Sequence, residues 1–188
     1  QIENLLAVCR KRHIDKIAIT DHNCLEGALR AYQLDPARVI VGEEIQTTQG
    51  EILGYFMSEE IPEGLEPMEV VKRLKEQDAF ISVAHPFDPN RDETHWQPGM
   101  LESLVPQLDA IEVFNARCLQ RKFNEQAQDF ACKHNLIEMA GSDAHSPSEL
   151  GRATLLLPLF NSVEEFRQAI KQAKIDARLS GSYVHLFS

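Results

Sequence analysis

The sequence lacks several features that would assign it to a familiar class at once. No apolar run approaches the roughly 20 residues of a membrane-spanning helix, and no signal peptide is visible. The 4 cysteines are scattered and form no Cys-x-x-Cys pair. Together these absences argue against a membrane partner and against a disulfide framework, and they favour a reduced, cytoplasmic chain.

Positive charge is also scarce. The chain carries 19 Lys and Arg against 29 Asp and Glu, which gives a net charge of −10 and a pI near 5.2. A protein that binds long nucleic acid usually presents a basic surface, so this balance disfavours such a partner. Bound divalent cations would offset part of the negative charge. No internal repeat or low-complexity segment is present, and 188 residues with 43% hydrophobic content predict one soluble domain over residues 1–188.

What is present is a regular alternation of strand and helix patterns. Strands that alternate with helices of about ten or more residues predict βαβ units and a parallel sheet, either open or closed into a barrel. Gln49 and Gly50 predict a hairpin turn between two of the strands, and Ser162 with Glu165 predicts a capped helix start. The expected helices are 2–12, 24–33, 68–77, 100–107, 117–134 and 162–173, and the expected strands are 15–20, 38–45, 51–57, 79–86, 109–115, 136–143 and 153–158.

Both ends of the chain look incomplete. The sequence begins at Gln1 inside an amphipathic helix, and it ends at residues 183–188, "YVHLFS", which have the pattern of a strand cut short. We therefore expect natural sequence to be missing at both ends.

The segment "GSDAH", residues 141–145, follows an apolar strand and is the first candidate site. On an extended strand, residues two apart point to the same face, so Asp143 and His145 would project side by side. Such a pair serves as a ligand set for Zn, Mn or Fe, or as an acid/base pair in which the carboxylate orients the ring. The alternative is a solvated surface loop, because so short a pattern arises often by chance.

Other strands deliver the same residue types to the same kind of place. In parallel α/β folds the carboxyl ends of the strands form one edge, where sites are built. If the polar residues at these strand ends were random, they would include many Lys and Ser. Instead, the residues there are almost all of types that bind metals. Of Glu43 and Glu44, only one can point inward, because neighbouring strand residues face opposite sides. The residues at strand ends are His22, Glu43, Glu44, His85, Glu112, Asn115, Asp143 and His145.

The motifs "ITDHN", "GEEI", "AHP", "IEVFNAR" and "GSDAH", in this order, resemble the PHP (polymerase and histidinol phosphatase) superfamily, and its stand-alone metal-dependent phosphoesterases above all. The resemblance covers nearly the whole chain. It implies a distorted barrel of seven βα units, with two or three divalent metals (Mn, Fe or Zn) at its carboxyl-terminal mouth, and hydrolysis of phosphate esters. It also implies metal-ligand roles for His22, Glu44, His85, Asp143 and His145.

Two departures from the family pattern affect this expectation. The family opens with a strand that bears a His-x-His motif, and this sequence contains no such motif. Gln1 falls where the helix that follows this strand should begin. We therefore expect the first strand to be missing, and the chain alone to bind metal incompletely and to be inactive. Many relatives also carry a ligand His just before "ILGYF", where this chain has Glu51. Glu51 is either a substitute ligand or an ordinary hairpin residue.

The resemblance assigns further roles. Asn115 and Arg117 match the family's Asn-x-Arg, and Arg suits the recognition of a substrate phosphate, although a salt bridge at a helix start is the alternative for Arg117. A metal-activated water would attack the phosphorus atom, with His145 or Asp143 relaying a proton to the leaving group. The expected substrate is a small phosphorylated metabolite or nucleotide. The alternatives are an exonuclease that trims oligonucleotides and a PHP-like binding domain that has lost catalysis.

Overall fold

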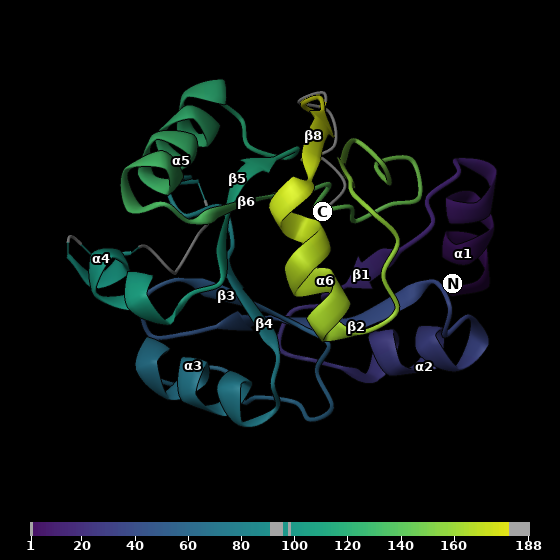
Figure 1. The fold of residues 1–188 in the computed structure, drawn as a ribbon, viewed down its shortest axis with the longest axis horizontal. Helices are drawn as coiled ribbons and strands as arrows, with labels where there is room; N and C mark the ends of the chain where they lie inside the picture. The colour runs from purple at the N-terminus through teal and green to yellow at the C-terminus, as the bar shows by residue number, and fades with distance from the viewer. Residues whose placement is uncertain (1, 91–95, 98, 181–188) are drawn as a thin grey trace.

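The computed structural model of the chain describes residues 2–90, 96–97 and 99–180. Its helices are α1 (Ile2–Lys11), α2 (Glu26–Leu34), α3 (Pro67–Glu76), α4 (Met100–Leu104), α5 (Arg121–His134) and α6 (Val163–Ala169), with 3-10 turns η1 (Val105–Gln107) and η2 (Ile170–Gln172). Its strands are β1 (Ile17–Ile19), β2 (Val39–Gln46), β3 (Glu51–Tyr55), β4 (Phe80–Val83), β5 (Ala110–Asn115), β6 (Ile137–Gly141), β7 (Ala153–Leu156) and β8 (Lys174–Ala177). Figure 1 shows helices α1 to α5 around the periphery of the molecule and the strands between them.

The expected elements are present, with small shifts at their ends. The predicted hairpin is confirmed, since β2 and β3 pair antiparallel and the side chain of Thr47 accepts hydrogen bonds from the N–H groups of Gln49 and Gly50. The predicted cap is also confirmed, because Ser162 Oγ accepts a hydrogen bond from the N–H of Glu165 at 3.2 Å. Strand β8 has no counterpart among the predictions, and the strand predicted at residues 183–188 lies outside the described residues.

The predicted (βα)7 barrel with a parallel sheet is not confirmed by the strand pairing. The described strands form one four-stranded sheet, in the order β1-β2-β3-β4, and two separate pairs, β5-β6 and β7-β8. The β1–β2 and β5–β6 pairs are parallel, whereas β2–β3, β3–β4 and β7–β8 are antiparallel. Of the antiparallel pairs, β2 and β3 are joined by a turn that is too short for a parallel crossover. A few hydrogen bonds link the sheets: Asp109 and Ile81 bond each other twice, and Ser142 Oγ donates to the carbonyl and accepts from the N–H of Ala153.

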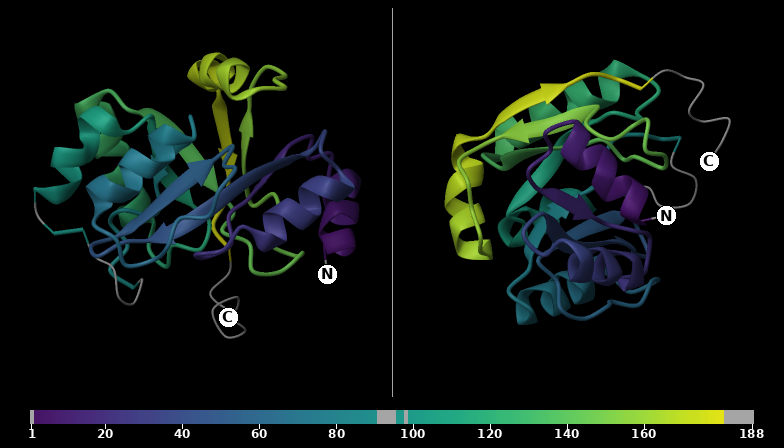
Figure 2. Two further views of the ribbon diagram at one scale, coloured as in Figure 1. Left: turned by 90° about the horizontal axis from the view of Figure 1, so that it is seen from below. Right: turned by 90° about the vertical axis from the view of Figure 1, so that its right-hand side faces the viewer.

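The apolar core lies between the strands and the helices that cover them. The largest cluster packs α2 and α3 against β2, β3 and β4, with Ile45, Ile52 and Leu74 fully buried. A second cluster packs α6 against the opposite side of β4, through Phe166 and Phe80. In Figure 2, α6 lies beyond the ends of β7 and β8, apart from the other helices. No helix among the described residues is long and apolar enough to cross a membrane.

Glu43 is a buried carboxylate within the first of these clusters. Its side chain is 0% exposed, Oε2 accepts a hydrogen bond from the N–H of Ile61 at 3.1 Å, and Oε1 has no hydrogen-bond partner in the described part of the chain. Burial raises the pKa of Glu43 to about 7, from an ordinary value of 4.5. The folded protein therefore retains a proton that the unfolded chain releases, and stability falls as the pH rises from about 4.5 to about 7.

We expect Glu43→Gln to raise the free energy of unfolding by about 3.5 kcal/mol at pH 8, since burial raises this pKa from 4.5 to about 7 and each pKa unit corresponds to about 1.4 kcal/mol. Glutamine keeps the carbonyl acceptor for Ile61 and removes the buried charge. At pH 4, where Glu43 is protonated in both states, the change should be small. Urea denaturation at both pH values measures the difference, with Glu76→Gln as the control at an exposed position. A gain that is the same at both pH values would contradict the assignment.

Candidate metal centre

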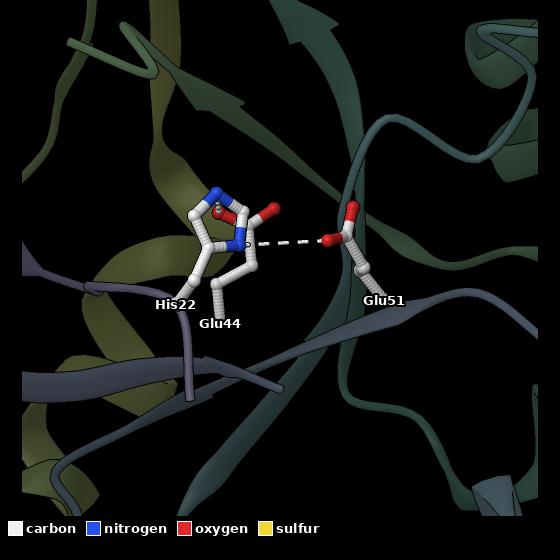
Figure 3. A group of neighbouring side chains, drawn as sticks. All are labelled: His22, Glu44 and Glu51. Atoms are coloured by element: carbon white, nitrogen blue, oxygen red, sulfur yellow. Dashed lines mark ion pairs between the residues drawn. The ribbon is translucent and has the colours of Figure 1, made fainter. Parts of the chain in front are cut away.

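Four side chains from four elements converge at one point of the four-stranded sheet. One ligand atom each from His22, Glu44 and Glu51 lies within 4.8 Å of the others, and Figure 3 shows the three side chains facing one another. His85 completes the group, with Nε2 at 3.0 Å from Glu44 Oε1 and 3.1 Å from Glu51 Oε2. We call these four residues the His/Glu cluster. It combines imidazole and carboxylate donors, a set that suits Zn, Mn or Fe.

The pairing of the strands places these residues together. His22 follows β1 and forms a parallel bridge with Glu44 in the carboxyl-terminal half of β2. Glu51 begins β3, and its carbonyl accepts a hydrogen bond from Ala84, the residue before His85 at the end of β4. Because β3 runs antiparallel to its neighbours, the start of β3 lies beside the carboxyl ends of β2 and β4. This is why Glu51, at the start of a strand, reaches the same point as residues near strand ends.

Glu51 and Glu44 hold positive charge on His22. A hydrogen bond with Glu51, reinforced by the charge of Glu44, raises the pKa of His22 to about 9 although partial burial opposes this. Burial works against ionisation of Glu51, but hydrogen bonds with His22 and His85 outweigh it and hold the pKa of Glu51 well below its usual value. Without a metal, protons on imidazole thus supply the positive charge that these carboxylates attract. A divalent cation would replace those protons, because metal ligands bind in their deprotonated forms.

Asp143 and His145 lie beside this cluster on the loop that follows β6. The ring of His145 lies 6.4 Å from that of His22, and its Nδ1 lies 3.5 Å from Asp143 Oδ1 and 3.1 Å from the carbonyl oxygen of Asp143. The carboxylate of Asp143 is 10% exposed, whereas the ring of His145 is 39% exposed and borders the cleft. The structure therefore brings together all six residues for which the sequence predicted metal binding.

Glu112 is a member of this site that the predicted ligand set omitted. It is buried on β5, where Oε2 accepts hydrogen bonds from the N–H of His85 at 2.9 Å and from Asn115 Nδ2 at 3.0 Å. Burial raises its pKa to about 7. Its other oxygen packs so closely on Gly141 that a Cβ there would lie 2.2 Å from it, which explains the glycine in "GSDAH". The available signal in the sequence was its place among the carboxylates near strand ends.

Asn115 connects the two halves of the site. Its Nδ2 group donates to both Glu112 and Asp143, the latter at 3.2 Å, and its Oδ1 accepts from the N–H of Arg117 at 2.9 Å. It is 2% exposed, and it lies at the wall of the cleft, where its amide orients the neighbouring carboxylates. The contact of Asn115 with substrate stays a prediction.

Arg117 also occupies a different environment from the one predicted. Its side chain is 3% exposed, is not among the residues that line the cleft, and faces Glu149, with Nη1 at 3.5 Å from Glu149 Oε1. The other oxygen of Glu149 accepts hydrogen bonds from the N–H of His145 at 3.2 Å and from Ser146 Oγ at 3.0 Å. The salt bridge that the sequence left as the alternative is therefore present. Through Glu149 it supports the His145 loop, and the role of Arg117 in substrate binding stays a prediction.

Two residues of the site have strained backbones. His85 has a φ of 23° and Asp143 a φ of 46°, both in the left-handed region that side chains with a Cβ adopt at a cost. Such strain persists only where surrounding contacts hold it, and it is most frequent at functional sites. Here the bond from the N–H of His85 to Glu112 and the bond from Asn115 to Asp143 supply those contacts.

A cleft of about 1330 Å³ opens beside the site, between β1 on one side and β6 and β7 on the other. His22, Glu44, Asp143 and His145 line one part of it, while Tyr55 and Phe160 contribute to an apolar part. This volume exceeds the roughly 300–1,000 Å³ of typical small-molecule sites. A metal at the His/Glu cluster would therefore be accessible to a ligand from the cleft.

The comparisons with known sequences agree with the motifs. The family model described as PHP-associated matches residues 121–175. Two uncharacterized proteins of Methanocaldococcus jannaschii are 39% identical over 116 residues and 40% identical over 147 residues, which is 60% and 77% of this chain. The matched regions cover 65% and 58% of those relatives, so the chain spans less than two thirds of their length.

Three solved structures share the fold. A proposed metal-dependent phosphoesterase from Bifidobacterium adolescentis superposes with a TM-score of 0.64 at 16% identity, over 78% of this chain and 83% of that one. A two-domain protein from Bacteroides vulgatus that contains a PHP-like metal-dependent phosphoesterase domain, itself assigned by prediction, gives 0.72 at 18%, over 93% and 60%. PsfC from Pseudomonas syringae gives 0.68 at 16%, over 96% and 83%. Fold and family model together support the PHP superfamily.

Proposed function

With the PHP superfamily as the premise, we propose that this protein is a metal-dependent phosphoesterase that hydrolyses a small phosphorylated metabolite or nucleotide. The observation that carries the proposal is the convergence of His22, Glu44, Glu51 and His85 beside a large cleft. A structural ion-pair network would not need to face a cleft, and it would not need a second acid–imidazole pair next to it. With Asp143 and His145, this cluster offers six imidazole and carboxylate groups to divalent ions, and the expected His-x-His strand would supply the remaining ligands for two or three ions.

Each residue has a distinct task in the proposed reaction. The His/Glu cluster and Asp143 hold the cations, which when bound lower the pKa of a coordinated water and polarise the phosphate. Glu112 and Asn115 fix the backbone of His85 and the carboxylate of Asp143. After His22, His145 is the most exposed acid/base group near the cleft entrance. In the proposed reaction it gives a proton to the leaving oxygen of the ester.

The proposal predicts that the full-length protein releases phosphate from phosphomonoesters when supplied with Mn²⁺, and that chelation by EDTA removes the activity. Phosphate release over a panel of sugar phosphates, nucleotides and p-nitrophenyl phosphate measures this, with Mn²⁺, Fe²⁺ and Zn²⁺ tested in parallel. Readdition of the metal should restore the rate. A metal-loaded sample that hydrolyses none of these esters would reject the proposal, and activity confined to short oligonucleotides would favour an exonuclease.

A further inference from the structure

Two arginines lie opposite each other where the antiparallel pair of β7 and β8 borders the cleft. The register of this pair places Ala153 opposite Ala177, so the next residues outward, Arg152 and Arg178, are cross-strand partners. The N–H of Arg178 donates to the carbonyl of Arg152 at 2.8 Å. Like charges at directly opposite positions destabilise a strand pair. Neither guanidinium has an ion pair or a side-chain hydrogen bond in the described structure. The exposed Asp176, the next acidic residue on β8, pairs with neither.

A third arginine reaches the same region from α1. Arg12 Nη1 donates to the carbonyl of Leu150 and to that of Ser148, at 3.3 Å in the latter case. Arg12, Arg152 and Arg178 all line the cleft, although they come from three separate elements. In a chain of net charge −10, this local concentration of positive charge would attract anions to the cleft.

The arginine pair lies near the candidate metal centre without contacting it. Ala153, which follows Arg152, is hydrogen-bonded to Ser142, which precedes Asp143. Nevertheless, within the described residues neither Arg152 nor Arg178 forms an ion pair with a carboxylate of the site, that is, with Glu44, Glu51 or Asp143. Because neither guanidinium group pairs with these carboxylates, both are available to an anion other than a phosphate held at the metals.

We propose that Arg152 and Arg178 form a second anion site in the cleft, which binds a second phosphate or carboxylate on the substrate while the reacting phosphate lies at the metal centre. This inference rests on the proposed function and specifies its substrate class as molecules with two separated anionic groups. The planar guanidinium group donates paired N–H bonds that match the oxygens of either anion. The third arginine, Arg12, is already held by backbone carbonyls and adds charge to the rim.

The test uses alkanediol bisphosphates of increasing chain length and the monophosphates of the same diols, so that the unknown spacing between the two anions is sampled. For the wild type, kcat/KM should be about tenfold higher for the best bisphosphate than for its monophosphate, which corresponds to about 1.4 kcal/mol. Arg152→Gln and Arg178→Gln should each lower this ratio, and the double variant should bring it near one. Added NaCl should also lower the ratio, because salt screens charges at an accessible rim.

The matched control is Arg121→Gln, on α5, where the side chain is 81% exposed and lies outside the cleft. It should keep the wild-type ratio. The proposal is overturned if no bisphosphate is preferred at any length, or if the preference survives in the double variant. It is also overturned if both substrates slow equally, since the arginines would then serve the reacting phosphate.

A second measurement separates this inference from the proposed function. If no ester is hydrolysed with any metal, the phosphoesterase proposal fails, but calorimetry can still compare the binding of each bisphosphate and monophosphate. Tighter binding of a bisphosphate by the wild type, lost in the double variant, would support the anion site. Equal binding of both compounds would reject it.

Discussion

His85→Ala is expected to lower phosphoester hydrolysis by more than about 100-fold and to reduce the metal content of the purified protein. Loss of a group that merely supports a metal ligand typically costs about 10–100-fold in affinity or activity, and His85 is placed as a ligand itself. Its side chain is 5% exposed and lies within 3.1 Å of both Glu44 and Glu51. Without the imidazole, two carboxylates remain close together, and their repulsion should raise the pKa of one of them and weaken cation binding.

The measurement combines elemental analysis after dialysis with kcat/KM at saturating Mn²⁺. His134→Gln is the control, because His134 ends α5 and stacks on Phe130 away from the cleft. That variant should keep both metal and activity. Wild-type metal content together with wild-type activity in His85→Ala would exclude the His/Glu cluster as the metal site.

Glu149→Gln is expected to lower the free energy of unfolding by about 3 kcal/mol, because removal of one partner from a buried ion pair leaves the other charge uncompensated. Arg117 is 3% exposed at its side chain, and its Nε and Nη1 atoms have no hydrogen-bond partner within the described residues. Its charge therefore depends on Glu149. The glutamine keeps an oxygen that can accept the N–H of His145, so the substitution removes the charge more than the loop contact.

A double-mutant cycle separates the ion pair from other effects. Replacement of Arg117 by Met removes the buried cation, so Arg117→Met with Glu149→Gln should be more stable than Glu149→Gln alone. Urea denaturation of the wild type, both single variants and the double variant gives the coupling energy. If the losses in the free energy of unfolding are strictly additive, the two side chains do not interact. The His145 loop would then be stabilised by the hydrogen bonds of Glu149 and not by the ion pair.

The residues of the site were largely predictable because their signals are local. A His, Asp or Glu at the end of an apolar strand stands out in the sequence, and adjacent residues on a strand must face opposite sides. That rule allowed only one of Glu43 and Glu44 to point inward, and the resemblance to the PHP motifs selected Glu44. In the structure Glu44 faces the cluster, while Glu43 is buried among the apolar residues behind the sheet. The role of Glu51 remained open, because nothing local indicates that the start of an antiparallel strand lies beside the end of β4.

The contacts of Arg117 and Asn115 could not be predicted for a related reason. Both match a motif that suggests substrate binding, but burial and hydrogen-bond partners depend on elements far away in the sequence. Glu149 lies 32 positions after Arg117, and Asp143 lies 28 positions after Asn115. A motif specifies residue types, whereas the folded chain determines which of their atoms remain available to a ligand.

The sequence by itself determined the helix and strand segments, the β2–β3 hairpin, the helix cap at Ser162 and the types of residue at the site, because each depends on periodicity, turn chemistry or strand alternation over a few residues. Only the tertiary structure decided the division into three sheets, the place of Glu51 in the His/Glu cluster, the supporting role of Glu112 and the opposition of Arg152 and Arg178 across the cleft rim. These features arise from pairings between distant segments, where register and direction are set by the packing of the whole chain.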